Sequence, residues 1–387
     1  MKKFLDCISV VGSTPSRFQG TKKYVSTGAV ATTEIDESEV VEVSYEDRPS
    51  RANLTAEADD ILFAKMQGTR KTLLLDSETE ENIYSTGFCA VRANPEIITT
   101  ECLYYLVDSE LFLAQKDKNC SGATQKAITN GGLAKIEIRI PPLSEQAMLA
   151  EKLRSLTQLI ADRKKQLELF DEVIKSRFIE MFGASGEERF PMETLPQIIA
   201  KDKNSLKRGP FGGALKKEDF VDKGYLVYEQ RHAIHNDFEY EKYYITPQKY
   251  EDMIMFKVAP GDLIISCSGV TLGRIAEIPP YAKEGIINQA LLKVSLDQKI
   301  MTNTFFIHQF RSDRIQDILF GFCRGSGIPN FPSMSEVKAV QFICPPIELQ
   351  TQFADFVEQI DKSKFEIQKS LEKLETLKKA LMQKYFG

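Results

Sequence analysis

Polar and basic side chains follow one apolar segment in each half of the chain. Residues 58–64 and 260–266 both have the pattern of a turn that leads into a buried strand. Arg, Lys, Asn and Gln read the edges of bases, whereas Ser, Thr and glycine amides bind phosphates, so the residues behind these strands favour nucleic-acid binding. An ordinary solvated loop is the alternative for each residue taken alone. The candidate DNA contacts are Lys65, Gln67, Thr69, Arg70, Lys71, Thr124, Gln125, Lys126, Arg231, Ser268, Thr271, Arg274, Asn288, Gln289, Arg324, Ser326 and Asn330.

Two short motifs resemble catalytic sites but lack the groups that the chemistry requires. Residues 278–281, Ile-Pro-Pro-Tyr, resemble the Pro-Pro box of amino-methyltransferases, yet Ile278 cannot accept a hydrogen bond from a base amino group. Residues 237–242 are similar to the (Asp/Glu)-x-Lys tripeptide of metal-dependent nucleases, but Lys242 directly follows Glu241. We interpret the first motif as a Pro-Pro turn between strands and the second as a solvated strand end.

Metal and cofactor sites have equally little support in the sequence. His232 and His235 could form half of a metal site, but two solvent-facing histidines are the simpler interpretation. The 7 cysteines include no CxxC pair, which argues against a structural zinc site or a disulfide framework and favours reduced thiols. The sequence contains no GxxxxGK(S/T) phosphate loop, HExxH motif or nucleophile elbow. We therefore expect a binding protein that is not an enzyme and holds no metal or cofactor.

Charge and hydropathy limit the class of protein further. The 387 residues exceed what one hydrophobic core usually covers, so two domains are expected. The net charge is −5, and no segment is strongly basic: residues 1–140 hold 16 Lys+Arg against 21 Asp+Glu, and residues 184–344 hold 20 against 20. DNA binding must therefore come from local patches. The mean hydropathy is −0.25 and no apolar run is long enough to span a membrane, so we expect a cytoplasmic chain.

A duplication organises the chain. Residues 140–183 align with residues 344–387 without a gap, over 44 residues and at a constant offset of 204. Both segments begin with Pro-Pro and end with Phe-Gly, which unrelated helices would rarely share. The chain is therefore expected to contain two copies of one plan. The ten identical positions are Pro141/Pro345, Pro142/Pro346, Gln146/Gln350, Ala150/Ala354, Lys165/Lys369, Leu167/Leu371, Glu168/Glu372, Lys175/Lys379, Phe182/Phe386 and Gly183/Gly387.

Each aligned segment has the pattern of one long helix with a coiled-coil seam. Apolar residues recur at alternating steps of three and four, and roughly 38 residues of helix would span about 57 Å. Arg163 and Arg177 interrupt the first stripe and Lys364 and Lys378 the second, so we expect them at the edge of the seam or facing partner subunits. Two amphipathic helices on separate domains are the alternative to one internal pair. The stripes are Leu153, Leu156, Ile160, Leu167, Phe170, Ile174 and Met181, and Val357, Ile360, Ile367, Leu371, Leu374, Leu381 and Tyr385.

The two blocks in front of the helices are predicted to share one mixed fold. Ser-Gly pairs at 121–122 and 326–327 and final strands at 134–140 and 337–344 follow in the same order in both. The fold class is therefore α/β (α+β) with internal duplication. We predict α/β domains at 1–140 and 184–344 and long spacer helices at 141–183 and 345–387, which pack against each other as an antiparallel pair.

The whole chain resembles the specificity (S) subunits of type I restriction–modification systems. The resemblance rests on the duplicated plan, on Pro-Pro-Leu-Ser-Glu-Gln at 141–146, on Phe-Gly at 182–183, and on the domain openings at 12–16 and 209–213. The second copy departs from the family pattern at 345–350, where Pro-Pro-Ile-Glu-Leu-Gln lacks the Ser-Glu-Gln form.

The resemblance implies a concrete function. Each α/β block would be a target-recognition domain for one half of a bipartite double-stranded DNA site, and the helices would set the fixed unread gap. Two methyltransferase (M) subunits that carry S-adenosylmethionine and methylate adenine would bind this chain, and restriction (R) subunits that use ATP and Mg²⁺ would join them. This subunit would be non-catalytic, without cofactor, metal or membrane contact. A protein-interaction scaffold with a duplicated helical tether, or an enzyme with its own methyltransferase or nuclease site, are the alternatives.

Overall fold

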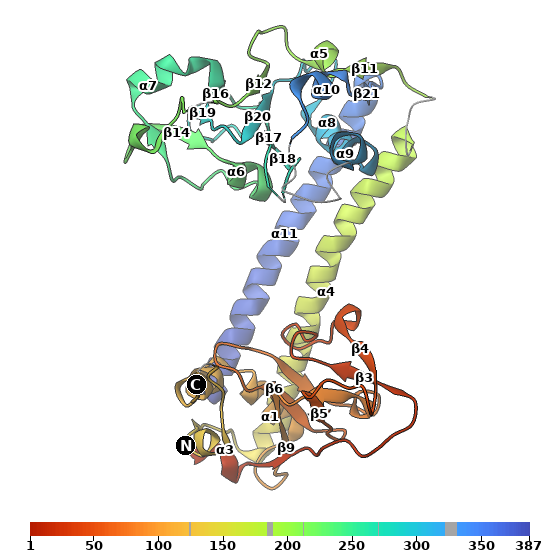
Figure 1. Ribbon diagram of the computed structural model, residues 1–387, viewed down its shortest axis with the longest axis vertical. Coiled ribbons are helices and arrows are strands. Elements are labelled where there is room, and N and C mark those ends of the chain that lie inside the picture. The colour runs from red at the N-terminus through yellow and green to blue at the C-terminus, as the bar shows by residue number, and fades with distance from the viewer. Residues whose placement is uncertain (124, 184–188, 212, 270, 322–330) are drawn as a thin grey trace. The chain divides into compact units, whose positions relative to one another are not determined.

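Contacts along the chain divide it into two units, each of which holds a part of both long helices. Unit 1 combines residues 1–166 with 367–387, and unit 2 comprises residues 167–366. The structure is a computed structural model that describes residues 1–123, 125–183, 189–211, 213–269, 271–321 and 331–387 (Figure 1). The boundary between the units passes through the middle of both helices, so each unit is an α/β domain together with the helical segments packed on it.

The described residues of unit 1 form two four-stranded sheets and three short helices. The first sheet is antiparallel in the order β2-β9-β6-β7, and the second has the order β4-β3-β8-β5 with β3 and β8 parallel. A separate two-stranded sheet pairs β1 with β10. The elements are β1 (Lys2–Lys3), β2 (Ile8–Val11), β3 (Thr21–Val25), β4 (Val41–Ser44), β5 (Ala52–Leu54), β6 (Ile61–Ala64), β7 (Thr72–Leu74), β8 (Ile83–Ser85), β9 (Phe88–Ala93), α1 (Thr100–Val107), α2 (Glu110–Lys118), α3 (Asn130–Leu133) and β10 (Glu137–Ile138), with single 3-10 turns at Phe4–Asp6, Glu37–Glu39 and Thr79–Glu81.

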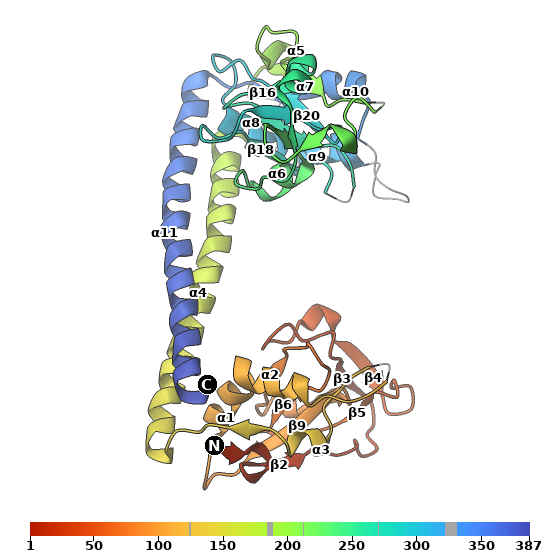
Figure 2. The ribbon, with the colours of Figure 1, turned by 90° about the vertical axis from the view of Figure 1, so that its left-hand side faces the viewer.

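The alternation of side chains along β6 produces three layers in unit 1. Successive residues of a strand point to opposite faces of its sheet. Ile61 and Phe63 therefore pack in the core beneath the helices, whereas Leu62 and Ala64 pack in the core against the second sheet. Figure 2 shows α1 and α2 between the long helices and the first sheet, with β3, β4 and β5 on the far side of that sheet. Both faces of β6 are thereby buried, which explains why its residues form an unbroken apolar run.

Unit 2 repeats this arrangement with one additional edge strand. Its sheets have the orders β12-β20-β17-β18 and β13-β15-β14-β19-β16, and β14 and β19 are the parallel pair. A third sheet pairs β11 with β21. The elements are β11 (Met192–Thr194), α5 (Leu195–Ile198), β12 (Leu206–Arg208), β13 (Phe220–Val221), β14 (Tyr225–Tyr228), α6 (Gln230–His235), β15 (Tyr244–Ile245), α7 (Pro247–Asp252), β16 (Lys257–Val258), β17 (Leu263–Ser266), β18 (Ile275–Glu277), β19 (Gly285–Ile287), β20 (Leu291–Val294), α8 (Asn303–Phe310), α9 (Asp313–Phe320), α10 (Met334–Ala339) and β21 (Gln341–Ile343), with 3-10 turns at Lys217–Asp219 and Ile254–Phe256.

The matching strand orders confirm the internal duplication. Sheet β2-β9-β6-β7 corresponds to β12-β20-β17-β18, and the parallel pair β3 and β8 corresponds to β14 and β19. The predicted final strands at 134–140 and 337–344 were wrong in extent, because only Glu137–Ile138 and Gln341–Ile343 pair with a neighbour. In the second copy, the capped helix α10 occupies Met334–Ala339 and so overlaps the region predicted as strand.

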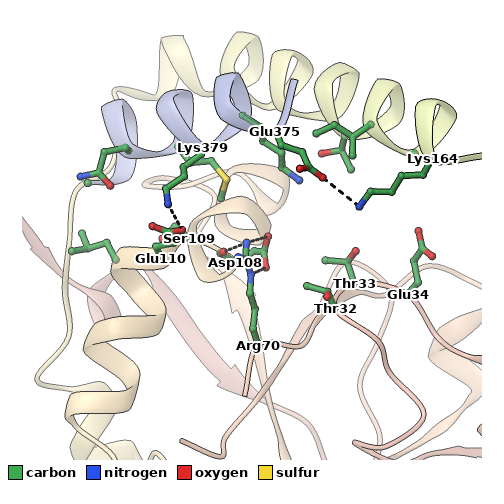
Figure 3. A pocket seen from close by; sticks show the side chains of 18 residues that line it. Thr32, Thr33, Glu34, Arg70, Asp108, Ser109, Glu110, Lys164, Glu375 and Lys379 are labelled. Carbon is green, nitrogen blue, oxygen red and sulfur yellow. Dashed lines mark hydrogen bonds and ion pairs between the residues drawn. The ribbon is translucent and has the colours of Figure 1, made fainter. Parts of the chain in front are cut away.

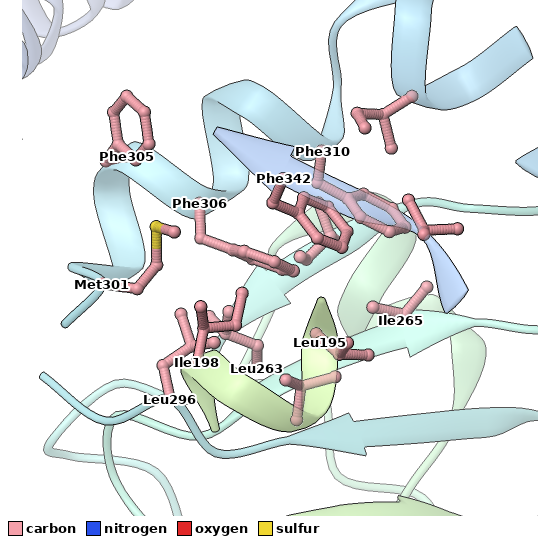
Figure 4. Packing of buried hydrophobic residues seen from close by; sticks show 14 of the residues in the cluster. Leu195, Ile198, Leu263, Ile265, Leu296, Met301, Phe305, Phe306, Phe310 and Phe342 are labelled. Carbon is pink, nitrogen blue, oxygen red and sulfur yellow. The ribbon is translucent and has the colours of Figure 1, made fainter. Parts of the chain in front are cut away.

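The core of unit 2 is rich in phenylalanine. Phe306, Phe310 and Phe342 pack over Leu263 and Ile265 of β17 (Figure 4). The ends of the long helices belong to the same cluster, since the rings of Phe182 and Phe353 lie 5.7 Å apart, centroid to centroid, and that of Phe182 lies 4.7 Å from Phe305. One continuous core therefore joins the sheet, α8 and both helical segments of unit 2.

The two long helices have the predicted lengths and the predicted buried stripes. Helices α4 (Leu143–Phe182) and α11 (Ile347–Phe386) each contain 40 residues, and each begins directly after the Pro-Pro pair. Gly183 has a φ of 83°, which makes it the left-handed stop that favours glycine. Every apolar residue predicted for the two stripes is buried or half-buried.

Within each unit the two helical segments run antiparallel. In unit 1, Leu153 near the start of α4 shares a core with Phe386 at the end of α11, and Lys164 pairs with Glu375 at 3.5 Å. In unit 2, Phe178 contacts Phe353 near the start of α11. Residues later in α4 therefore meet residues earlier in α11, which is the order that the antiparallel prediction requires.

Three of the charged residues that interrupt the stripes are half-buried and bound locally. Lys364 crosses to the other helix, where its Nζ lies 2.5 Å from Oδ1 of Asp171. Arg163 donates to Gln166 and Arg177 to Glu180, each at 2.7 Å and one turn along its own helix. The cations thus lie beside the seam and keep their polar ends at its margin, as long basic side chains commonly do.

A buried glutamine connects each long helix to its own α/β domain. Gln146 is 0% exposed; its Oε1 accepts from the Thr99 amide at 2.8 Å, and its Nε2 donates to the carbonyls of Ile97 and Pro141, both at 3.0 Å. Thr99 is the N-cap of α1, so one amide joins the start of the long helix to the start of α1.

The second copy repeats this connection. Gln350 is also 0% exposed; it accepts from the Thr302 amide at 2.9 Å and donates to the carbonyls of Ile300 and Pro345 at 2.9 and 2.8 Å. Thr302 is the N-cap of α8. The two glutamines therefore occupy the same position of the repeat and satisfy the same three backbone groups.

We predict that Gln146→Met destabilises unit 1 by about 2–4 kcal/mol, because three buried backbone groups lose their partner at once. Gln350→Met should destabilise unit 2 to a similar extent. The free energy of unfolding from urea denaturation measures both. Gln158→Met, on the exposed side of α4, is the matched control and should change stability by less than about 0.5 kcal/mol. Equal stability of the Gln146 and Gln158 variants would contradict the proposed connection.

Candidate nucleic-acid interface

The predicted contacts of the first domain lie on two adjoining segments of unit 1. We name the loop between β6 and β7, residues 65–71, the first reading loop. The Gln67 amide donates to the Lys126 carbonyl at 3.0 Å, and the Ile128 amide to the Lys65 carbonyl at 2.9 Å. The segment that ends at Lys126 therefore lies along this loop, which brings Gln67, Gln125 and Lys126 together with all three exposed.

The lysines of the first reading loop serve mainly to fix its conformation. Lys65 donates to the Thr86 carbonyl at 3.0 Å and Lys71 to the Thr27 carbonyl at 2.5 Å. The Lys65 and Lys71 side chains are both half-buried, as is Thr69 between them. These two lysines connect the loop to the segments after β8 and β3, so their charges are directed at the protein backbone.

Arg70 forms a bidentate ion pair with Asp108. Its Nε lies 2.9 Å from Oδ1 and its Nη2 lies 3.0 Å from Oδ2 of a carboxylate that is almost fully buried, and Nη2 also donates to the Asp108 carbonyl. These hydrogen bonds raise the pKa of Arg70. Because Nε and Nη2 are already occupied, a paired contact with guanine would have to break this ion pair, so the structure favours a structural role for this predicted contact.

The Arg70–Asp108 pair borders a cavity of about 440 Å³ within unit 1 (Figure 3). The ion pairs Lys379–Glu110 at 3.0 Å and Lys164–Glu375 at 3.5 Å form its other walls. Half-buried Lys378 also lines the cavity, and burial lowers its pKa. The charges of this cavity are largely paired with one another, and its walls join α1 and α2 to the long helices.

The second reading loop, residues 267–274 between β17 and β18, has a different environment. The Arg274 side chain is exposed. Arg311 is the C-cap of α8, as Asp108 is the C-cap of α1, so a cation replaces the carboxylate at the corresponding place. Burial, and then the neighbouring Arg274, lowers the pKa of Arg311. Repulsion from Arg311 favours an outward position of Arg274, which makes it the better candidate for a DNA contact.

Three further predicted contacts lie around the second reading loop. The Cys267 amide donates to the Ala290 carbonyl at 2.8 Å, which places Ser268 beside the turn that contains Asn288 and Gln289. Gly209 packs on this turn, because a Cβ at this position would lie 1.8 Å from the Asn288 carbonyl oxygen. Glycine is therefore required for the close approach of the two backbones.

The remaining predicted contacts of both domains divide into bound and undescribed residues. Thr271 accepts at its carbonyl from the Ser266 hydroxyl at 2.5 Å. Arg231 lies 3.4 Å from Asp237 and stacks on the Tyr240 ring. The predictions that lie outside the described residues are Thr124, Arg324, Ser326 and Asn330.

Sequence reasoning missed two polar residues that border the second reading loop. Gln230, at the start of α6, donates to the Ser268 hydroxyl at 2.8 Å, and its Oε1 is buried without a partner among the described residues. The Arg208 guanidinium stacks on Phe331 at 4.9 Å from the ring centroid and donates to the Cys267 carbonyl at 3.5 Å. The position of Arg208 directly before Gly209 was a usable signal, whereas nothing in the sequence marks Gln230.

The histidine prediction was wrong for His232. This residue is 1% exposed; its Nδ1 accepts from the Glu229 amide at 2.9 Å, and its Nε2 contacts the Tyr240 carbonyl at 2.9 Å. His235 is exposed, as predicted. The described part of the chain contains no group of His, Cys, Asp and Glu arranged to hold a metal ion, and none of its helices is long and apolar enough to cross a membrane.

The two motifs that resemble catalytic sites lie in connections between elements. Residues 278–281 connect β18 to β19, as expected for a Pro-Pro turn between strands, and Tyr281 is 70% exposed. Residues 237–242 lie between α6 and β15, where Glu241 pairs with Lys283 at 2.6 Å. That ion pair lowers the pKa of Glu241, which is the ordinary behaviour of a paired surface carboxylate.

Comparison with known proteins identifies a family for both halves of the chain. The family model described as "Type I restriction modification DNA specificity domain" matches residues 12–169 and 211–379. The specificity subunit of type I restriction enzyme EcoDI from Escherichia coli is 32% identical over 120 residues, which cover 30% of this chain and 26% of that protein. The MjaIX specificity subunit from Methanocaldococcus jannaschii is 21% identical over 323 residues, which cover 77% of this chain and 74% of that subunit.

Solved structures have the same fold. A chain from a study of "complex assembly and conformational transition of the type I R-M system" matches with a TM-score of 0.62 at 18% identity, over 99% of this chain and 96% of that one. The S subunit of a type I restriction–modification system from M. genitalium matches with a TM-score of 0.56 at 14% identity, over 100% and 95%. The duplicated architecture is therefore shared despite low sequence identity.

We predict that Arg70→Met destabilises unit 1 by about 1–3 kcal/mol, because the buried Asp108 carboxylate loses its partner. Arg274→Met should leave the free energy of unfolding within about 0.5 kcal/mol of the unsubstituted protein, since its side chain is exposed. Urea denaturation of the two variants makes the comparison. If both variants are equally stable, Arg70 has no structural role and is again a candidate for a DNA contact.

Proposed function

The chain belongs to the family of type I restriction modification DNA specificity domains, and we propose that it is the subunit that selects the DNA target of such a system. Each α/β domain reads one half of a bipartite site, and the paired long helices set the unread gap between the halves. The observation that carries this proposal is the repeated domain: two copies of one sheet order, each fixed to a long helix by the same glutamine contacts and each with its own loops. Loops on a common scaffold are where binding specificity commonly resides.

The polar loop residues supply the direct contacts to bases. In the first domain we assign this role to Gln67, Gln125 and Lys126, which are exposed and lie together. In the second domain we assign it to Arg274 and Gln289, which are exposed beside the second reading loop. Glutamine can bind adenine and arginine can bind guanine through paired hydrogen bonds. The remaining candidates of the first reading loop hold the loop in place.

The chemistry of the complex is assigned to partner subunits. We propose that two methyltransferase subunits bring S-adenosylmethionine and methylate adenine, and that restriction subunits bring the ATP- and Mg²⁺-dependent steps. This chain is then a non-catalytic cytoplasmic subunit. Its net charge of −5 is compatible with DNA binding if the partners neutralise much of the phosphate charge. The study of complex assembly in the type I system from which one structural relative comes supports partnership with other subunits.

The first experiment is to co-express the chain with its neighbouring methyltransferase gene and to map methylated adenines across the host genome by single-molecule sequencing. A two-part motif with a fixed gap is expected. Exchange of either α/β domain for that of another family member should change one half of the motif and leave the other unchanged. A stable complex that produces no new methylation would instead favour the scaffold alternative.

We predict that Gln67→Ala relaxes the sequence preference only in the half-site of the first domain, and that Gln289→Ala does so only in that of the second. A lost paired contact to a base lowers discrimination by about 1–3 kcal/mol, which is roughly 5- to 150-fold. Competition binding with DNA in which one half-site is randomised measures this effect. Thr21→Ala, at the exposed first residue of β3, is a control that should leave both half-sites unchanged. Preferences altered in both half-sites by either variant would contradict the assignment.

We also predict that one heptad inserted after Gln166 in α4 and after Gln368 in α11 lengthens the unread gap. Seven residues of helix add about 10.5 Å, which corresponds to roughly three base pairs. The same methylation map reports the new gap. An insertion in α4 alone is the control, and it should disrupt the complex because it shifts the two seams out of register. An unchanged gap in the double insertion would refute the role of the helices as a ruler.

A further inference from the structure

A buried lysine of α2 binds the backbone of the first reading loop. Lys116 of α2 is 0% exposed, and its Nζ lies 3.4 Å from Oδ1 of the neighbouring Asp117. Lysine is almost never fully buried unless it is paired. Its Nζ donates to the carbonyl oxygens of Ala64, Met66 and Thr69 at 3.3, 3.1 and 2.7 Å. An ammonium group has three donors, so these three carbonyls use all of them.

The three carbonyls belong to both arms of one turn. Ala64 ends β6, Met66 begins the loop, and Thr69 lies on its returning arm after Gly68, whose φ is 72°. The ammonium thus binds three converging backbone oxygens in the way that a small cation would. In addition, the Gln67 side chain donates to the carbonyl of Asp117 at 3.2 Å, so the tip of the loop is attached to the same turn of α2.

The second domain closes its corresponding loop differently. Helices α2 and α9 begin directly after their N-cap residues, Ser109 and Ser312, and this register places Leu319 where α2 has Lys116. Leu319 is 2% exposed and lies in the core of unit 2. There the Ser266 hydroxyl closes the loop, since it donates to the Thr271 carbonyl at 2.5 Å and accepts from the Arg274 amide at 2.9 Å. The lysine is therefore a feature of the first domain alone.

We propose that Lys116 is a positioning residue for sequence recognition: it fixes the first reading loop in the conformation that presents Gln67 to DNA, without touching DNA itself. This inference rests on the proposed function. Fixing a loop before binding reduces the ordering cost of binding and makes the contacts geometrically selective. Without the ammonium, three backbone carbonyls lose their partner and must find water, so the turn loosens and only the weaker contacts of Gln67 with Asp117 and Lys126 are left to position it.

The test compares complexes of the full chain with its methyltransferase partners. Lys116→Met retains most of the side-chain volume and removes all three hydrogen bonds. We expect discrimination in the first half-site to fall by about tenfold or more, which corresponds to roughly 1.4 kcal/mol, while discrimination in the second half-site is unchanged. Competition binding with either half-site randomised separates the two. Unchanged discrimination in the first half-site overturns the proposal, and an equal loss in both half-sites overturns it as well, because that result indicates general unfolding.

A second variant keeps the test decisive if Lys116→Met does not fold. Lys116→Gln retains two donors, so its discrimination in the first half-site should lie between that of the unsubstituted protein and complete loss. An unchanged value for this variant also overturns the proposal. The double variant Lys116→Met with Gln67→Ala should discriminate no worse than Lys116→Met alone, because the lysine acts through that glutamine. If the two substitutions lower discrimination additively, the lysine does not act through Gln67.

Two matched controls separate the three hydrogen bonds of Lys116 from the loss of a charge and from a change in a buried side chain. Lys118→Met removes an exposed charge from the same helix, and Leu319→Met alters the equivalent buried position of the second domain. Both should preserve the specificity for both half-sites.

The unsubstituted complex separates this inference from the function on which it rests. If that complex reads no bipartite target, the proposed function fails. If it reads one and Lys116→Met reads the same one with equal discrimination, only the inference about Lys116 fails.

Discussion

A single buried amide on each long helix determines where that helix begins relative to its α/β domain. Gln146 and Gln350 each satisfy the amide of an N-cap threonine, a carbonyl just before it, and the carbonyl of the first proline. A buried glutamine that left any of these groups unpaired would be strongly unfavourable, so the contacts occur together. Because the helix start is fixed by three directional bonds, the apolar stripe that follows has a defined rotation, and the antiparallel seam within each unit is built on it.

The two units differ in the contacts that close their reading loops and in the C-caps of α1 and α8. A buried ammonium closes the first reading loop, whereas a serine hydroxyl closes the second. The C-cap of α1 is an aspartate that neutralises Arg70, but the C-cap of α8 is Arg311. The sheet order survives these exchanges because the strands bury their apolar faces independently of the loop ends. A scaffold of this kind lets one loop change without altering the other, which a reader of two independent half-sites requires.

The long helices and the duplication were predictable because they depend on regular spacing. Stripes at steps of three and four, the Pro-Pro starts and Gly183 are local signals, and both helices begin and end as expected. The roles of individual cations were not predictable in this way. Arg70 and Lys71 have the residue types of DNA contacts, yet partners from distant elements bind them, namely Asp108 of the α1 end and the carbonyl of Thr27. The burial of His232 was hidden for the same reason, since the Tyr240 carbonyl that it contacts comes from a later loop.

Several cations of the first reading loop and its surroundings are bound to the protein's own backbone. Lys65, Lys71 and Lys116 direct their charges at backbone carbonyls, so these three cations of the first domain hold loops in shape. A cation used in this way contributes little to the long-range attraction of DNA, because its field is partly cancelled by the carbonyl dipoles around it. Under the proposed function, phosphate contacts come largely from other subunits, whereas shape and hydrogen bonding in the loops supply discrimination. The separation is useful, because a subunit that bound phosphates strongly by itself would hold every sequence almost equally well.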